Sequence, residues 1–178
     1  RRNHHRMRRA IVLLGAMEQG IGIVNGLHEF LSDDPEFAAA AAAYGVIMLD
    51  VDDFKTINDS HGHAAGDQIL RELGKIILNQ VRGEDIPCRY GGDEFIIILP
   101  GISSAADAAA VASKAIAALS TAIEANGHEL HTSPSIGISL FPDDGPDGDT
   151  VLKNADTAMY HAKAAGRNNF QFFAAEMN

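Results

Sequence analysis

The feature that most constrains the fold is a pair of glycines placed between two runs of strand composition. Cys88-Arg89-Tyr90 precedes Gly91-Gly92, and the apolar run Phe95-Ile96-Ile97-Ile98-Leu99 follows shortly after. Glycine adopts the backbone conformations that tight turns need, so this pattern predicts a β-hairpin. Asp93 and Glu94 come directly after the glycines, and the hairpin would therefore carry two carboxylates at its tip.

A second expected strand also ends in acids. The apolar run Gly45-Val46-Ile47-Met48-Leu49 leads into Asp50-Val51-Asp52-Asp53. A short apolar run of this kind predicts a buried strand. Carboxylates at a rigid strand end suit Mg²⁺, which prefers oxygen ligands. Taken alone, the same acids fit a solvated acidic loop equally well.

The segments between the strands have helical patterns. A short helix is expected around Phe54–Ser60, and an amphipathic helix from about Ala64 to Val81. Further helices are expected over residues 6–19, 36–43, 104–125 and 150–165, and further strands over 129–131 and 135–140, as a pair, and over 169–173. Helices that alternate with strands around one tight hairpin predict an α+β (mixed α/β) domain with a single mixed sheet.

Charge and composition restrict the partners. The chain has 14 basic and 24 acidic residues and a formal net charge of −10. Five arginines lie in the first nine positions, so residues 10–178 carry 9 − 24 = −15. Such a body would repel a nucleic-acid backbone. The single cysteine fits a reducing compartment, and no apolar run approaches the roughly 18 residues of a membrane span. We therefore expect a cytoplasmic domain that binds neither nucleic acid nor membrane.

Two cations near the end of the chain complete a candidate phosphate site. Lys163 and Arg167 are four residues apart, which would place them on one face of the expected last helix. Acids that hold a metal, together with cations that hold phosphate oxygens, indicate phosphoryl or nucleotidyl transfer. Alternatively, the two cations only complement the end of that helix, with Gly166 as the residue that closes it.

Together these motifs resemble the GGDEF domain of diguanylate cyclases. Gly91-Gly92-Asp93-Glu94-Phe95 matches the signature of that family, and other blocks match in order from about Gly45 to Phe173. These blocks are Leu49 to Asp59, Gly62-His63, Gly66-Asp67, Arg89-Tyr90, Ser135 to Ser139, and Ala155 to Asn168. Several ordered blocks are a far more specific signal than one short motif.

The resemblance implies one GGDEF catalytic domain over residues 1–178. Its core would span residues 45–173, after an N-terminal helical segment over 1–44 with an insertion at 20–43. The implied architecture is similar to palm and nucleotidyl-cyclase folds: a mostly antiparallel five-stranded sheet flanked by helices, with the signature on a hairpin turn.

The resemblance also implies roles for individual residues. Asp50, Asp93 and Glu94 would be catalytic and, with the Val51 carbonyl, would hold Mg²⁺ or Mn²⁺, two ions per active site. Asp93 would be a shared metal ligand or the base for the ribose 3′-OH. Asn58 and Asp67 would read the guanine edge, although Asp67 alone is better interpreted as a helix N-cap. The other substrate contacts would come from Asp53, Phe54, Lys55, Gly91, Gly92, Lys163 and Arg167.

The implied reaction condenses two GTP into cyclic di-GMP with release of pyrophosphate, in a homodimer of facing half-sites. Arg82 and Asp85 resemble the inhibitory product site of the family, and a loop salt bridge is the alternative. The helix expected over 104–125 offers only Lys114 as a further cation there. Because the chain begins with Arg, we expect a missing upstream sensor or regulatory domain, and the parent protein could be membrane-anchored.

A different class of function is a catalytically silent GGDEF module that binds GTP or cyclic di-GMP as a signalling receptor. Silent members typically lose the acids or glycines of the turn. Here Asp50, Asp93 and Glu94 are all present, which favours the enzyme.

Overall fold

The computed structural model describes residues 43–125 and 127–178. The elements are β1 (Tyr44–Val51), α4 (Phe54–His61), α5 (His63–Gln80), β2 (Ile86–Gly91), β3 (Glu94–Pro100), α6 (Ala105–Leu119), β4 (Ile123–Ala125), β5 (His128–Leu130), β6 (Pro134–Phe141), α7 (Gly148–Ala164), β7 (Phe170–Phe172) and the 3-10 helix η1 (Ala175–Met177). The helices expected over 6–19 and 36–43 and the insertion at 20–43 lie outside the described residues, apart from Ala43. No helix in the described part of the chain is long and apolar enough to cross a membrane.

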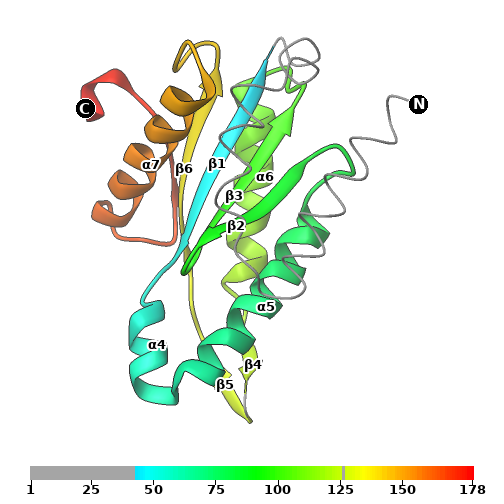
Figure 1. Cartoon of the computed structure of the whole chain (residues 1–178), viewed down its shortest axis with the longest axis vertical. Coiled ribbons are helices and arrows are strands. Elements are labelled where there is room, and N and C mark those ends of the chain that lie inside the picture. Colours follow the sequence, from blue (N-terminus) through cyan, green and yellow to red (C-terminus); the bar gives the residue numbers. More distant parts are fainter. Residues whose placement is uncertain (1–42, 126) are drawn as a thin grey trace.

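Five strands form the central sheet, in the order β2-β3-β1-β6-β7 (Figure 1). The β2–β3, β3–β1 and β1–β6 pairs are antiparallel, and only β6–β7 is parallel. This confirms the predicted mostly antiparallel five-stranded sheet, with the glycine pair at the turn between β2 and β3. β1 lies in the middle and is buried along its whole length, which explains why its sequence is a continuous apolar run.

Helices cover both faces of the sheet, and the side chains of β1 alternate between them. Ile47 and Leu49 belong to a core shared with α5 and α6. Val46 and Met48 belong to a second core with Tyr44, Cys88 and residues of α7. Figure 1 shows α7 on one side of the sheet, with α5 and α6 on the other. The sheet is therefore a rigid central layer whose strand ends can position functional groups.

The segment after α6 differs from the prediction. We expected a helix through residue 125, but α6 ends at Leu119 and residues 123–125 form β4. Ile123 and Ala125 are buried against the core while Glu124 is exposed, which is the period-two pattern of a strand. β4 pairs with β5 in a separate two-stranded ribbon. The expected pairing of residues 129–131 with 135–140 is therefore wrong, because β6 pairs with β1 and β7 instead.

Candidate active site

The acid-bearing end of β1 meets the hairpin tip. In the antiparallel β1–β3 pair, Asp50 lies directly opposite Glu94, so the two side chains lie on the same face of the sheet. The Val51 amide donates a hydrogen bond to the Asp93 carbonyl at 3.2 Å, which ties the strand end to the turn. The structure thus brings these three acids into one region. Among the described residues, however, no group of three His, Cys, Asp or Glu side chains forms a ready-made metal cage.

The electrostatics of this region show an excess of negative charge. Burial is the main cause that raises the pKa of Asp50, whose exposed fraction is 8%. Asp93 adds to this shift, and the ammonium of Lys163 opposes it. Burial also raises the pKa of Glu94, followed by the charge of Asp50. Carboxylates that share a partly buried place favour either a proton or a bound cation.

We expect Glu94→Gln to stabilise the folded protein at neutral pH. The pKa of Glu94 in the fold is above its ordinary value of 4.5. The favourable contribution of the protonated group is therefore complete below 4.5 and is lost as the pH rises through the raised pKa. Glutamine mimics the protonated acid at every pH, so the variant should unfold at a higher temperature than wild type at pH 7.5, and the difference should shrink at pH 4. Thermal unfolding in EDTA without nucleotide measures this difference. A variant that is less stable than wild type at pH 7.5 would contradict the conclusion that the negative charge of Glu94 destabilises the fold.

The first predicted cation, Lys163, reaches the acids from α7. Its Nζ lies 2.9 Å from Asp50 Oδ2, and its side chain is 33% exposed. α7 is held against the sheet mainly by contacts with β6, including Gly137, where a Cβ would overlap the Ala155 carbonyl and the Met159 amide. Because Gly137 has no side chain, α7 lies very close to β6 at this point. This close approach fixes where Lys163 lies relative to the end of β1.

The second predicted cation, Arg167, lies beyond α7, so its placement on one helical face with Lys163 is wrong. The helix ends at Ala164, and Gly166, with φ +111, reverses the chain. The Gly166 and Arg167 amides donate to the Lys163 and Ala162 carbonyls at 3.3 and 3.2 Å, which is the Schellman ending of a helix. The prediction that Gly166 closes this helix is thus confirmed. Arg167 still faces the acids of β1, with Nε 3.9 Å from Asp52 Oδ1.

Asp52 organises the site in a way that sequence reasoning missed. It is only 4% exposed, and its carboxylate accepts hydrogen bonds from Ser133 Oγ at 2.5 Å and Ser135 Oγ at 2.6 Å. It also accepts from the Asn168 amide at 3.2 Å. This carboxylate therefore joins β1 to the start of β6 and to the loop that carries Arg167. The solvated-loop interpretation is wrong for Asp50 and Asp52; Asp53 is exposed.

Arg89 is a second residue without a predicted role. Its Nε and Nη2 both donate to the Gly92 carbonyl, at 2.9 and 2.7 Å. Gly92 has φ +51, a conformation that favours glycine. The guanidinium therefore clamps the turn that presents Asp93 and Glu94. The tight turn was predictable from the glycines, but the clamp was not, since the sequence does not show where a β2 side chain points.

The remaining predicted substrate residues lie on the two helices after β1. Asp53, with φ +56, precedes α4, which begins with Phe54 and Lys55. Asn58 is in the middle of α4 and partly buried, and Asp67 is exposed on α5. Because α5 begins at His63 with Gly62 as its N-cap, the interpretation of Asp67 as an N-cap is wrong.

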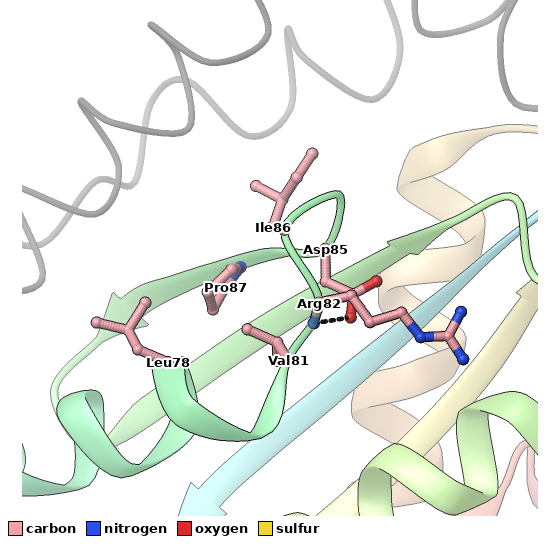
Figure 2. Close-up of a pocket in the computed structure, with 7 residues that line it drawn as sticks. Leu78, Val81, Arg82, Asp85, Ile86 and Pro87 are labelled. Atoms are coloured by element: carbon pink, nitrogen blue, oxygen red, sulfur yellow. Dashed lines mark hydrogen bonds between the residues drawn. The ribbon is translucent and has the colours of Figure 1, made fainter.

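Arg82 and Asp85 lie together in the turn between α5 and β2. The Arg82 amide donates to Asp85 Oδ2 at 2.7 Å, and Asp85 is buried, which is the main cause that raises its pKa. Figure 2 shows the Arg82 guanidinium directed away from the Asp85 carboxylate. A pocket of about 180 Å³ adjoins this turn; it is lined by Leu78, Val81, Arg82, Gly83, Asp85, Ile86 and Pro87.

The family of the chain is identified by a match that covers most of its sequence. A family model described as "Diguanylate cyclase, GGDEF domain" matches residues 26–169. The chain therefore belongs to the GGDEF-domain family, and both the resemblance and the predicted fold class are confirmed.

Individual relatives carry different activities in their names. The bifunctional diguanylate cyclase/cyclic di-GMP phosphodiesterase MucR of Pseudomonas aeruginosa is 40% identical over 152 residues, which are 85% of this chain and 21% of MucR. The cyclic di-GMP phosphodiesterase PdeR of Escherichia coli is 41% identical over 134 residues, 75% of this chain and 20% of PdeR. The crystal structure of the GGDEF domain of TpbB (YfiN) from P. aeruginosa matches with a TM-score of 0.73 and 38% identity, over 74% of this chain and 83% of that one. The chain thus spans about a fifth of the length of the first two relatives.

Proposed function

We propose that this chain is an active diguanylate cyclase, which condenses two GTP into cyclic di-GMP. The observation that carries the proposal is the cross-strand pair Asp50 and Glu94 beside the Asp93 turn, with Lys163 2.9 Å from Asp50. Acids and a cation at one partly buried place can bind a metal–triphosphate complex, and carboxylates whose pKa is raised by burial and by one another are typical of functional sites.

The triphosphate would bind where β1 ends and α4 begins. The first amides of a helix have no intrahelical partner, and those of Asp53, Phe54 and Lys55 would bind the terminal phosphates. Lys163, which is one-third exposed and now pairs with Asp50, would turn to the phosphate oxygens. Arg167 would add a second positive charge from the loop that Asp52 holds. Backbone donors and side-chain cations together neutralise a polyanion better than either alone.

The carboxylates fit divalent metal ions, because oxygen donors are the ligands that Mg²⁺ and Mn²⁺ prefer. Asp50, Glu94, Asp93 and the Val51 carbonyl would hold them, with two ions in each active site. When bound, the ions supply positive charge that offsets the charge of the triphosphate. Asp93 is a shared ligand or accepts the proton of the attacking ribose 3′-OH.

The guanine base of the nucleotide would be selected by Asn58 and Asp67. A carboxylate accepts from both N1–H and the amino group of guanine, and adenine offers no such donor pair. The exposed position of Asp67 on α5 leaves this carboxylate accessible to a nucleotide.

Two copies of the chain would complete the reaction. The 3′-OH of each GTP attacks the α-phosphorus of the other, two phosphodiester bonds form, and two pyrophosphates leave. One domain holds one GTP, so the two sites must face each other across a two-fold axis. The rate should therefore rise more steeply than in proportion to protein concentration below the dimer dissociation constant.

The test is incubation of the purified chain with GTP and Mg²⁺, followed by separation and mass identification of the nucleotides. The proposal expects cyclic di-GMP and two pyrophosphates per product. The second candidate is a silent receptor module, favoured by the match to PdeR, which is named only as a phosphodiesterase. Bound GTP that is recovered unchanged would support the receptor and refute the enzyme.

We also propose that Arg82 and Asp85 bind cyclic di-GMP as an inhibitory site, and we expect Arg82→Ala to raise the inhibition constant of added product about tenfold. The buried Asp85 already holds the turn, and the Arg82 guanidinium is directed away from its carboxylate (Figure 2). Arg82 is exposed, so its guanidinium can donate to the proposed ligand. Loss of a charge-assisted hydrogen bond supports that magnitude. Initial rates at increasing cyclic di-GMP measure it, with Lys153→Ala, the loss of an exposed cation of α7, as the control. An unchanged inhibition curve in Arg82→Ala would leave the turn a purely structural one.

We also propose that this domain is part of a longer protein. The much greater length of MucR and PdeR supports an upstream sensor or regulatory domain. Cys88 is a free, buried thiol, which is compatible with the proposed cytoplasmic location.

A further inference from the structure

The helix pair α4–α5 brings a side chain of one helix against a glycine of the other. Gly66 is buried near the start of α5. A Cβ at this position would overlap Asn58 Oδ1 and would lie 3.0 Å from Asn58 Cγ and from Phe54 Cζ. The Asn58 amide therefore occupies the space that any other residue at position 66 would fill.

The backbone around this contact is fixed by hydrogen bonds. The Gly62 amide donates to the Asn58 carbonyl at 2.8 Å, and the Gly66 amide donates to the Gly62 carbonyl at 3.3 Å. Gly62 itself has φ +82 and makes the turn between the helices. Since these bonds set the spacing of α4 and α5, a side chain at position 66 would displace the flexible end of Asn58 rather than the helices.

We propose that Gly66 is a positioning residue for guanine recognition. Its missing side chain lets the Asn58 amide lie against α5, next to the helix turn that carries Asp67. This inference rests on the proposed function, in which Asn58 and Asp67 read the guanine edge. A residue at 66 would turn Asn58 away and remove one of the two guanine contacts while leaving the phosphate contacts in place.

The test compares wild type, Gly66→Ala, Asn58→Ala and the double variant by their affinities for non-hydrolysable GTP and ATP analogues with Mg²⁺. Loss of one base contact should weaken GTP binding by Gly66→Ala about tenfold and leave ATP binding unchanged. In the Asn58→Ala background, Gly66→Ala should have little further effect, because the overlapping group is already absent and only the milder 3.0 Å contact with Phe54 Cζ remains. A merely structural role would weaken GTP and ATP equally.

The outcomes separate the two proposals. A wild-type chain that does not prefer GTP to ATP would refute the proposed function itself. A wild-type chain with that preference, and a Gly66→Ala variant that keeps it, would refute only the role of Gly66. If Gly66→Ala alone fails to fold, the double variant should fold and bind GTP like Asn58→Ala; a double variant that also fails to fold would show that position 66 is limited by another neighbour.

Discussion

Replacement of Asp93 by asparagine should stop formation of cyclic di-GMP while GTP remains bound. Asp93 follows Gly92, whose carbonyl accepts hydrogen bonds from two nitrogens of Arg89. Because these bonds hold the turn, the substitution keeps a side chain of the same shape in the same place. Asparagine cannot accept the proton of a 3′-OH and is a weaker metal ligand than a carboxylate. We expect a loss of about 10²–10⁴-fold in turnover, the usual contribution of a positioned general base.

Initial rates of pyrophosphate release and product formation measure this loss, and calorimetry with a non-hydrolysable GTP analogue measures binding. Asp156→Asn is the matched control: Asp156 is an exposed acid of α7 whose charge also raises the pKa of Glu94, but it lies outside the hairpin. The control should retain turnover within a few-fold of wild type. Wild-type turnover in Asp93→Asn would remove Asp93 from the mechanism.

The second large effect concerns stability. Gly137→Ala should lower the free energy of unfolding by about 3 kcal/mol, at the upper end of the range for overpacked cores. The new Cβ would overlap the Ala155 carbonyl and the Met159 amide of α7. These are backbone atoms, so the whole helix would have to move away from β6, and Lys163 would move with it.

Urea unfolding followed by circular dichroism measures this change. Gly45→Ala, on the neighbouring strand β1, is the matched control, because its new Cβ would come within 3.2 Å only of the flexible Ile102 Cδ1. The control should lose much less stability than Gly137→Ala. Equal losses in the two variants would show that the close approach of β6 to α7 does not limit the fold.

Local pattern was sufficient for the parts of the fold that depend on neighbours in sequence. The glycine pair predicts the hairpin, and the continuous apolar run of β1 predicts a buried strand with acids at its end; both are observed. α5 begins and ends within one residue of its expected bounds, since its apolar spacing is regular. The resemblance to the GGDEF family added the strand number and the order of the motifs.

What sequence reasoning missed depends on contacts between distant segments. The partners of Asp52 lie 81, 83 and 116 positions away, so its burial could not be read from an acidic run that resembles a loop. Arg167 was misplaced because helical spacing was extended past Gly166, which reverses the chain. The register that sets Asp50 opposite Glu94 also emerges only from the paired strands. In this chain, local signals determine most of the elements, with β4 as an exception, and long-range hydrogen bonds determine how the site is arranged.

The account depends on the acids at the end of β1 and on the hairpin holding divalent ions beside a purine triphosphate. The most direct measurement is a Mn²⁺ titration followed by the electron paramagnetic resonance signal of the free ion, with a non-hydrolysable GTP analogue present. Wild type with the analogue should retain Mn²⁺ more tightly than the analogue alone, and the double variant Asp50→Asn/Glu94→Gln should fall to the level of the analogue alone. Mn²⁺ retention by the double variant equal to that of wild type would contradict the account.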